Sequence, residues 1–124
     1  MLNNTATVHT TVSQTNTAQA VGSGDLPVFA TPAMIALMEQ AACQAIAAVL
    51  EPGQSSVGTA IAVQHTAASL VGAEISASAT VAATNGRQVE FMLAAHCGGQ
   101  EIGCGTHTRF IIDAARFMGK LEQA

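Results

Sequence analysis

Aromatic and charged residues are scarce in this chain. Trp and Tyr are absent and the 124 residues include four Phe, so close packing of small side chains must fill the core. Charged residues make up 10% of the chain and hydrophobic residues 49%, which excludes the composition of a disordered protein. So few charges leave much of the surface uncharged, and part of that surface is expected to be buried against a second copy of the chain.

Basic residues are equally few, and the four of them (Arg87, Arg109, Arg116 and Lys120) form no basic stripe. With a net charge of −4, the chain lacks the phosphate-neutralising surface that nucleic acid requires, so no nucleic-acid partner is expected. One or two of these cations, mostly near the C-terminus, could still hold an anionic ligand. The length fits one domain, expected to span residues 1–124.

Cysteine is limited to Cys43, Cys97 and Cys104, an odd number without CxxC spacing. Reduced thiols that pack as small apolar groups are therefore expected. The N-terminal residues show neither the basic nor the apolar region of a signal peptide, so a cytoplasmic location is expected by default.

An apolar stretch over residues 33–50 approaches the length of a membrane span. Glu39, Gln40 and Gln44 lie near its middle, and no basic flanks or aromatic belts accompany it. These features favour a buried helix of a globular domain and no membrane partner. Because the helix is apolar nearly all round, one sheet cannot cover it, and a homodimer or higher oligomer is expected.

The hydrophobic pattern predicts one strand, a connector over residues 13–30, one long helix and four further strands. Thr31 and Pro32 suit the N-cap and first position of the helix, which is expected to end near Leu50. Short turns join the later strands, which predicts antiparallel neighbours and an α+β fold of one long helix on one sheet. Odd-numbered positions within 74–81 and 89–97 are predicted to share apolar faces. The strands are expected at residues 5–12, 57–66, 74–81, 89–97 and 101–112.

Glu39 is the only charge in the 18-residue apolar helix. In one interpretation, Glu39 points along a solvated edge or caps a backbone group. In the other, its surroundings tune the pKa of the carboxylate, which serves as a base, a nucleophile or the group that orients a base. Thr31 has a similar choice between capping the helix and acting as a nucleophile or oxyanion donor at the helix N-terminus.

His65 extends a predicted strand face that also carries Val57, Thr59, Ile61 and Val63. It is either a hydrogen-bonded core residue or, with Glu39 in need of a partner, a catalytic group. The other histidines are predicted to be strand-surface or packing residues. No two histidines have zinc-site spacing, so neither a metal nor another cofactor is expected. These other histidines are His9, His96 and His107.

Three strings carry a family resemblance: VFATPAMIALMEQAAC, LEPGQSSVGTAIAVQHTAA and EIGCGTHTRFII. From about Val28 to Lys120 the chain resembles the fluoroacetyl-CoA thioesterase-like branch of the hot-dog superfamily. The resemblance implies a hot-dog fold, in which a five-stranded antiparallel sheet wraps a long central helix. It also implies a dimer that hydrolyses an acyl-CoA-type thioester. By resemblance the catalytic residues are Thr31, Glu39 and His65, and the substrate-binding residues are Gly58 and Arg109.

The segment AVGSGDLPVF departs from that family, because it has no Phe before Phe29. The fluoroacetyl-CoA enzyme has phenylalanines in this segment that cover the acyl group. Selectivity for fluoroacetyl-CoA is therefore not expected, and the acyl group stays open. A hot-dog hydratase or dehydratase, and an acyl-thioester-binding protein without turnover, are the alternative functions.

Thr31 and Glu39 lie eight residues apart, which is roughly 12 Å along a helix. Either His65 bridges them, or the site is assembled from two chains across a dimer interface. The composite site at the interface is the prediction.

Overall fold

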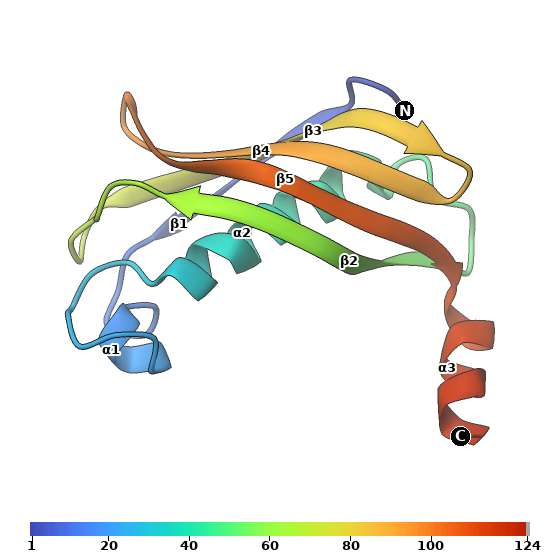
Figure 1. Cartoon of the computed structure of the whole chain (residues 1–124), viewed down its shortest axis with the longest axis horizontal. Helices are drawn as coiled ribbons and strands as arrows, with labels where there is room; N and C mark the ends of the chain where they lie inside the picture. The colour runs from blue at the N-terminus through green and yellow to red at the C-terminus, as the bar shows by residue number, and fades with distance from the viewer. Residues whose placement is uncertain (124) are drawn as a thin grey trace.

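The chain folds into one antiparallel sheet with a long helix beneath it, the predicted α+β arrangement (Figure 1). The computed structural model describes residues 1–123. The five strands lie in the order β1-β3-β4-β5-β2. The elements are β1 (Thr5–Thr11), α1 (Ala18–Val21), α2 (Thr31–Ala47), β2 (Gln54–His65), β3 (Glu74–Asn85), β4 (Gln88–Cys97), β5 (Gln100–Asp113) and α3 (Ala114–Gln123).

Helix α2 packs mainly against β1 and β3, and less extensively against β4 and β2. It ends at Ala47, before the predicted Leu50. Other positions such as Ala36, Gln40 and Cys43 are exposed in the single chain, and their burial against a second copy stays a prediction. The buried positions of α2 are Met34, Leu37, Met38, Ala41, Ala42, Ala45 and Ile46.

Within residues 1–123, alanine and valine occupy 11 of the 21 buried hydrophobic positions, and Phe, Met, Leu and Ile occupy the others. The odd-numbered positions of β3 from Ile75 to Val81 and of β4 from Val89 to Ala95 are buried, which confirms the predicted alternation on these two strands. Alanine at several of these positions lets α2 approach the sheet closely. The largest fully buried side chains are Phe29 and Phe91.

Strand β2 lies at the edge of the sheet and pairs with β5. A bulge between Gly58 and Ala60 shifts its register, so Gly58 lies opposite Arg109 and Ile61 opposite His107. Since an extra residue reverses the alternation, Val57 lies on the other side of the sheet from Ile61. The predicted common face from Val57 to His65 is therefore wrong at its beginning.

The connector over residues 13–30 is structured. Thr17 accepts a hydrogen bond from the Ala20 N–H at 3.1 Å and thereby caps α1, and single bridges tie Thr17 to Phe29 and Val28 to Leu70. At the other end of the chain, α3 leaves the sheet where β5 ends and has no buried residue (Figure 1). Among residues 1–123, no helix is long and apolar enough to cross a membrane.

Candidate active site

The first candidate cluster lies where the N-terminus of α2 meets the end of β2. Thr31 Oγ1 and His65 Nδ1 are 2.8 Å apart, within hydrogen-bonding distance. The helix N-cap is Ala30, and Thr31 is the first helical residue. The prediction that Thr31 is the N-cap is therefore wrong, because its hydroxyl bonds His65 instead.

His65 lies in a surrounding that disfavours its charged form. Burial lowers the pKa of the imidazole from its ordinary value of 6.5, and the backbone of Ala67 acts weakly in the opposite direction. Phe29 meets the ring edge-on, with centroids 6.4 Å apart. An uncharged ring can accept a proton, and Nδ1 is the nitrogen that faces the Thr31 hydroxyl.

A cavity of about 250 Å³ opens beside this pair. Its walls come from Ala18 in α1, Ser23, the end of the connector at Val28 and Phe29, and residues 65–68. The side chains of this wall are mostly small, so the cavity has room for a small acyl group next to the Thr31 hydroxyl.

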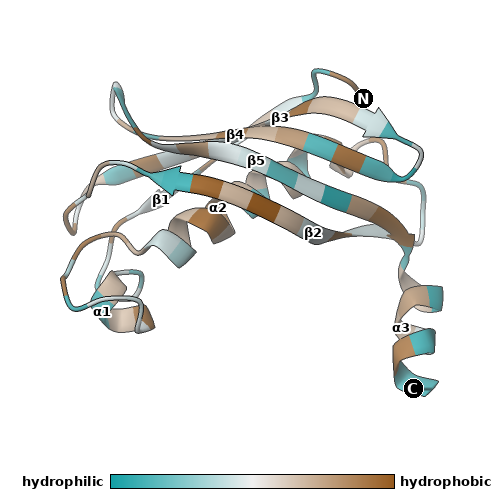
Figure 2. Cartoon of the chain, viewed as in Figure 1, coloured by the Kyte–Doolittle hydropathy of each residue, from teal (hydrophilic) through white to brown (hydrophobic). Residues whose placement is uncertain are grey.

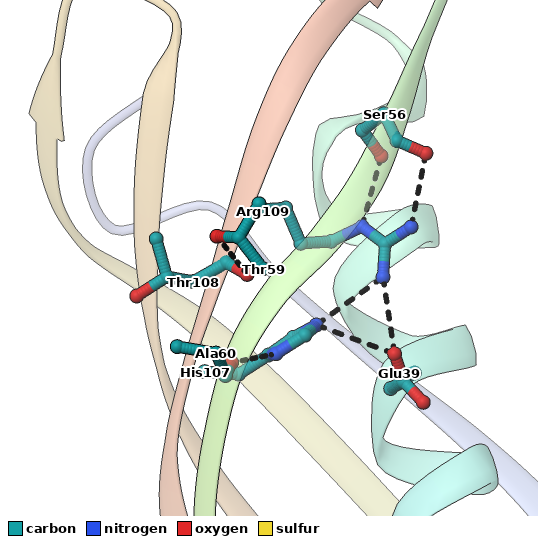
Figure 3. Close-up of polar contacts among 7 residues, drawn as sticks. All are labelled: Glu39, Ser56, Thr59, Ala60, His107, Thr108 and Arg109. Atoms are coloured by element: carbon teal, nitrogen blue, oxygen red, sulfur yellow. Dashed lines mark hydrogen bonds and ion pairs between the residues drawn. The ribbon is translucent and has the colours of Figure 1, made fainter. Parts of the chain in front are cut away.

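The second cluster surrounds Glu39, halfway along α2, and is built by two neighbouring strands (Figure 3). Arg109 on β5 donates from Nε to Ser56 Oγ at 2.9 Å and from Nη2 to the Ser56 carbonyl at 3.0 Å. Its Nη1 lies 3.5 Å from Glu39 Oε2. Arg109 is buried, and these contacts hold its guanidinium in one orientation toward the carboxylate.

His107 completes this second cluster, and the sequence reasoning missed it. Its Nδ1 lies 2.7 Å from the Ala60 carbonyl, which can only accept, so Nδ1 carries a hydrogen. Nε2 lies 3.2 Å from Arg109 Nη1, which can only donate, so Nε2 is the acceptor. His107 is therefore uncharged in this arrangement, and its 3.9 Å approach to Glu39 is not an ion pair.

One signal in the sequence points to His107. His107 and Arg109 are two residues apart on a strand, so their side chains must leave the same face of the sheet. What the sequence does not reveal is that this face meets Glu39, since that depends on how β5 lies over α2. His107 also stacks on Phe91, with ring centroids 5.9 Å apart.

Gly58 lies directly against the second cluster. A Cβ atom at Gly58 would be 2.9 Å from Glu39 Oε2, 3.1 Å from His107 Cε1 and 3.4 Å from Arg109 Nη1. The backbone of Gly58 is not in the left-handed region. Glycine is therefore favoured at this position by the lack of space for a side chain and not by backbone conformation. A further cavity of about 290 Å³ begins at this point, bounded by Glu39, residues 58–61 and His107.

Each predicted site residue thus lies in one of two groups. Thr31 and His65 form one, while Glu39, Gly58 and Arg109 form the other. Within residues 1–123, Glu39 has one ion-pair contact, to Arg109, and a 3.9 Å approach to His107. The alternative in which His65 bridges Thr31 and Glu39 is therefore not seen in one chain.

Comparisons with known proteins agree on one family. Residues 12–115 match the family model described as fluoroacetyl-CoA-specific thioesterase. The fluoroacetyl-CoA thioesterase of Streptantibioticus cattleyicolor is 45% identical over 96 residues, covering 77% of this chain and 69% of that protein. A crystal structure of a mutant of the fluoroacetyl-CoA-specific thioesterase FlK with fluoroacetate and CoA superposes with a TM-score of 0.87 at 36% identity, covering 94% of this chain and 98% of that one.

A hot-dog-like protein from Thermanaerovibrio acidaminovorans has a TM-score of 0.89 at 19% identity, covering 98% of this chain and 90% of that one. At this identity the likeness concerns the fold alone, and it confirms the predicted hot-dog fold.

Proposed function

The chain belongs to the fluoroacetyl-CoA-specific thioesterase family, and from this premise we propose how it hydrolyses a small acyl-CoA thioester to free acid and thiol. The observation that carries the proposal is the 2.8 Å contact between Thr31 Oγ1 and His65 Nδ1. A hydroxyl paired with an uncharged imidazole is the arrangement that activates a nucleophile for attack on an acyl carbon. The proposed catalytic residues are Thr31, Glu39 and His65.

In the first half of the reaction, Thr31 Oγ1 forms a bond to the thioester carbon while its proton passes to His65 Nδ1. The developing oxyanion is stabilised by backbone N–H groups in the first turn of α2, which have no partner within the helix. The carbon–sulfur bond then breaks, the thiolate takes the proton from His65, and the acyl group stays on Thr31 as an ester.

In the second half, a water molecule attacks the ester carbon, and Glu39 is the proposed base that takes a proton of the water. The bond between that carbon and Thr31 Oγ1 then breaks, Thr31 Oγ1 takes the proton back from Glu39, and the free acid leaves. The side chain of Glu39 is 41% exposed, so water reaches the carboxylate. Arg109 orients Glu39 from one side and His107 fixes the Nη1 of Arg109. Direct substrate contact by Gly58 and Arg109 stays a prediction, while their positioning of Glu39 is part of this proposal.

Two copies of the single domain are proposed to assemble the complete site. Strand β2 is an open edge with apolar residues along it (Figure 2), and Ile61 is exposed there. Such an edge is a template for pairing with another strand. In a two-fold antiparallel pairing of β2 with its copy, the Gly58 end of one strand approaches the His65 end of the other. The Glu39 cluster of one protomer then lies near the Thr31 of the second.

A mixture of Thr31→Ala and Glu39→Gln chains tests the composite site. If each site takes Thr31 from one copy and Glu39 from the other, mixed dimers regain one intact site of two. Random mixing then restores about a quarter of the wild-type activity, although each variant alone is inactive. No restoration in a mixture shown to exchange subunits would refute the composite site.

A thiol-release screen with short, branched and aromatic acyl-CoAs tests the function itself, with Glu39→Gln as the control. We expect turnover of small acyl groups without particular preference for fluoroacetyl, because the cavity wall beside Thr31 has small residues. Tight binding of acyl-CoA without thiol release would instead support a binding protein.

Mass spectrometry separates the two roles considered for Glu39. An acyl group trapped on the Thr31 peptide in Glu39→Gln supports the proposed order of steps. If single turnover in ¹⁸O-labelled water places label in the Glu39 carboxylate, Glu39 itself attacks the substrate. A cytoplasmic location, in keeping with three free thiols, also belongs to the proposal.

A further inference from the structure

Two buried polar side-chain atoms have no hydrogen-bond partner within residues 1–123, His65 Nε2 and Ser69 Oγ. Ser69 is only 5% exposed. Three other polar side chains are buried in the described part of the chain, and each of them has a hydrogen bond. Because buried polar groups in folded proteins almost always have a partner, these two atoms require an explanation.

Both atoms belong to the segment that follows β2, which pairs with the end of the connector. The Phe29 N–H donates to the Ser69 carbonyl at 2.9 Å, and a bridge joins Val28 to Leu70. Phe29 therefore lies opposite Ser69, and opposite residues of an antiparallel pair send their side chains to the same face. Leu70 is exposed on the other face, as the alternation of an extended segment requires. The Ser69 hydroxyl thus points inward beside the Phe29 ring.

Phe29 connects this geometry to His65. Its ring meets the imidazole edge-on, with centroids 6.4 Å apart, so the His65 ring and the Ser69 side chain adjoin the same buried aromatic ring. Burial lowers the pKa of His65, and the backbone of Ala67 acts in the opposite direction. A carbonyl oxygen that faces a ring N–H has this second effect. The segment that carries Ser69 therefore already presents oxygen to the imidazole.

The proposed reaction decides which nitrogen of His65 carries the hydrogen. Nδ1 must be free to take the proton of Thr31, so the neutral ring carries its hydrogen on Nε2. This N–H becomes a stronger donor when the ring gains the second proton, because both nitrogens then share the positive charge. A buried N–H without an acceptor would disfavour both this tautomer and the imidazolium.

We propose that Ser69 is a positioning residue for His65 and acts through one bound water molecule. The water accepts a hydrogen bond from the Nε2–H and donates one to Ser69 Oγ, since these two atoms do not bond each other directly. Buried waters in proteins commonly satisfy such polar atoms. The contact holds the tautomer in which Nδ1 accepts from Thr31, and it stabilises the charge that His65 gains in the first half of the reaction. Its effect on catalysis rests on the proposed function, whereas the contact itself does not.

The kinetic test removes the hydroxyl in Ser69→Ala, which adds no atom and is expected to fold. We expect kcat for acetyl-CoA to fall about tenfold, in the range for one hydrogen bond lost from a group that becomes charged, while KM keeps its wild-type value. Ser69→Thr retains a hydroxyl and is expected to retain most of kcat. Ser78→Ala makes the same chemical change at a half-buried position of β3 and is expected to leave kcat and KM unchanged.

Nitrogen-15 NMR of the histidine side chains tests the contact apart from turnover, with His65→Gln identifying the signals of His65. In the wild type we expect the hydrogen on Nε2. In Ser69→Ala we expect a lower pKa of His65, because the loss of an acceptor disfavours the imidazolium. His65 is the one titratable group among the residues that line the cavity beside it, so the shift reports on the surroundings of this ring.

Wild-type kcat and wild-type His65 pKa in Ser69→Ala, or a hydrogen on Nδ1 in the wild type, would overturn the role of Ser69. An equal loss of kcat in Ser69→Ala and a folded Ser69→Thr would also overturn it, since Ser69 would then contribute packing and not its hydroxyl. If the wild type releases thiol from no acyl-CoA of the screen, yet the His65 pKa falls in Ser69→Ala, the proposed function fails and the contact stands.

Discussion

Gly58 is the point where β2 comes closest to the Glu39 cluster, and Gly58→Ala tests whether that closeness matters. The added Cβ would be 2.9 Å from Glu39 Oε2. The neighbouring His107 and Arg109 leave little room for the methyl group on the other sides. Because the carboxylate is the far end of a flexible side chain, we expect Glu39 to move and the strand to stay in place.

The size of the effect follows from that displacement. Moving Oε2 from 2.9 Å to the 3.4 Å at which ordinary contact begins requires a shift of 0.5 Å. A misplacement of about 1 Å costs on the order of 100-fold in rate, so half of it costs roughly tenfold in kcat/KM. Crowding beside a packed strand lowers the free energy of unfolding by about 1 kcal/mol.

The assay measures kcat/KM by thiol release and the free energy of unfolding by urea denaturation. Gly99→Ala is the matched control, because nothing lies within 4 Å of an added Cβ at this exposed turn. We expect wild-type values of both quantities for Gly99→Ala. The double variant Gly58→Ala/Glu39→Asp has a shorter carboxylate and should recover the lost stability but not the activity. Wild-type kcat/KM in Gly58→Ala would refute the reasoning that Glu39 is held in place against this glycine.

Four further outcomes are expected. His107→Phe keeps an aromatic ring but removes both imidazole nitrogens, which leaves an Arg109 N–H unpaired. The free energy of unfolding should then fall by about 1–3 kcal/mol, and kcat/KM should fall with it. Unchanged values of both, in urea denaturation and thiol-release assays, would remove His107 from the site. Burial lowers the pKa of His65 below 6.5, so kcat/KM should rise with pH through that lowered pKa and level off by about pH 6.5. The same shift gives stability that is present above pH 6.5 and lost as pH falls through the folded-state pKa, so His65→Gln should flatten this decline in a urea series. Gly105→Ala would drive a Cβ into the Ala62 carbonyl oxygen of the adjacent strand, and a loss of at least about 3 kcal/mol, or no folded protein, is expected in circular dichroism.

The sheet was predictable where one of its faces is buried by the helix. On β3 and β4 the alternation of apolar and polar residues coincides with burial against α2, so periodicity identifies the inward positions. On β2 the alternation wrongly predicts that Val57 shares a face with Ile61. The bulge at Gly58 adds a residue without leaving a mark in the hydrophobic pattern, and β2 lies beyond the helix that would select for alternation.

Sequence could identify a site residue where its type is unusual for the element that carries it. Glu39 stands out because a charge in an apolar helix requires a local explanation, and the structure supplies Arg109 as its neighbour. His107 is an ordinary residue within its own strand, and only the way β5 lies over α2 reveals that it faces Glu39. The sequence left the Thr31 hydroxyl open between capping and catalysis, because a one-residue difference in the helix start is below the resolution of sequence patterns.

The separation of the two clusters within one protomer has a physical advantage for a site that must hold a carboxylate. Arg109 lies at 3.5 Å from one oxygen of Glu39, and the side chain stays 41% exposed, so the charge keeps water while the chain is alone. Burying the carboxylate beside a neutral Thr31 and His65 in the same chain would impose a desolvation cost during folding. In the proposed dimer that cost arises only when two protomers and a substrate close the site.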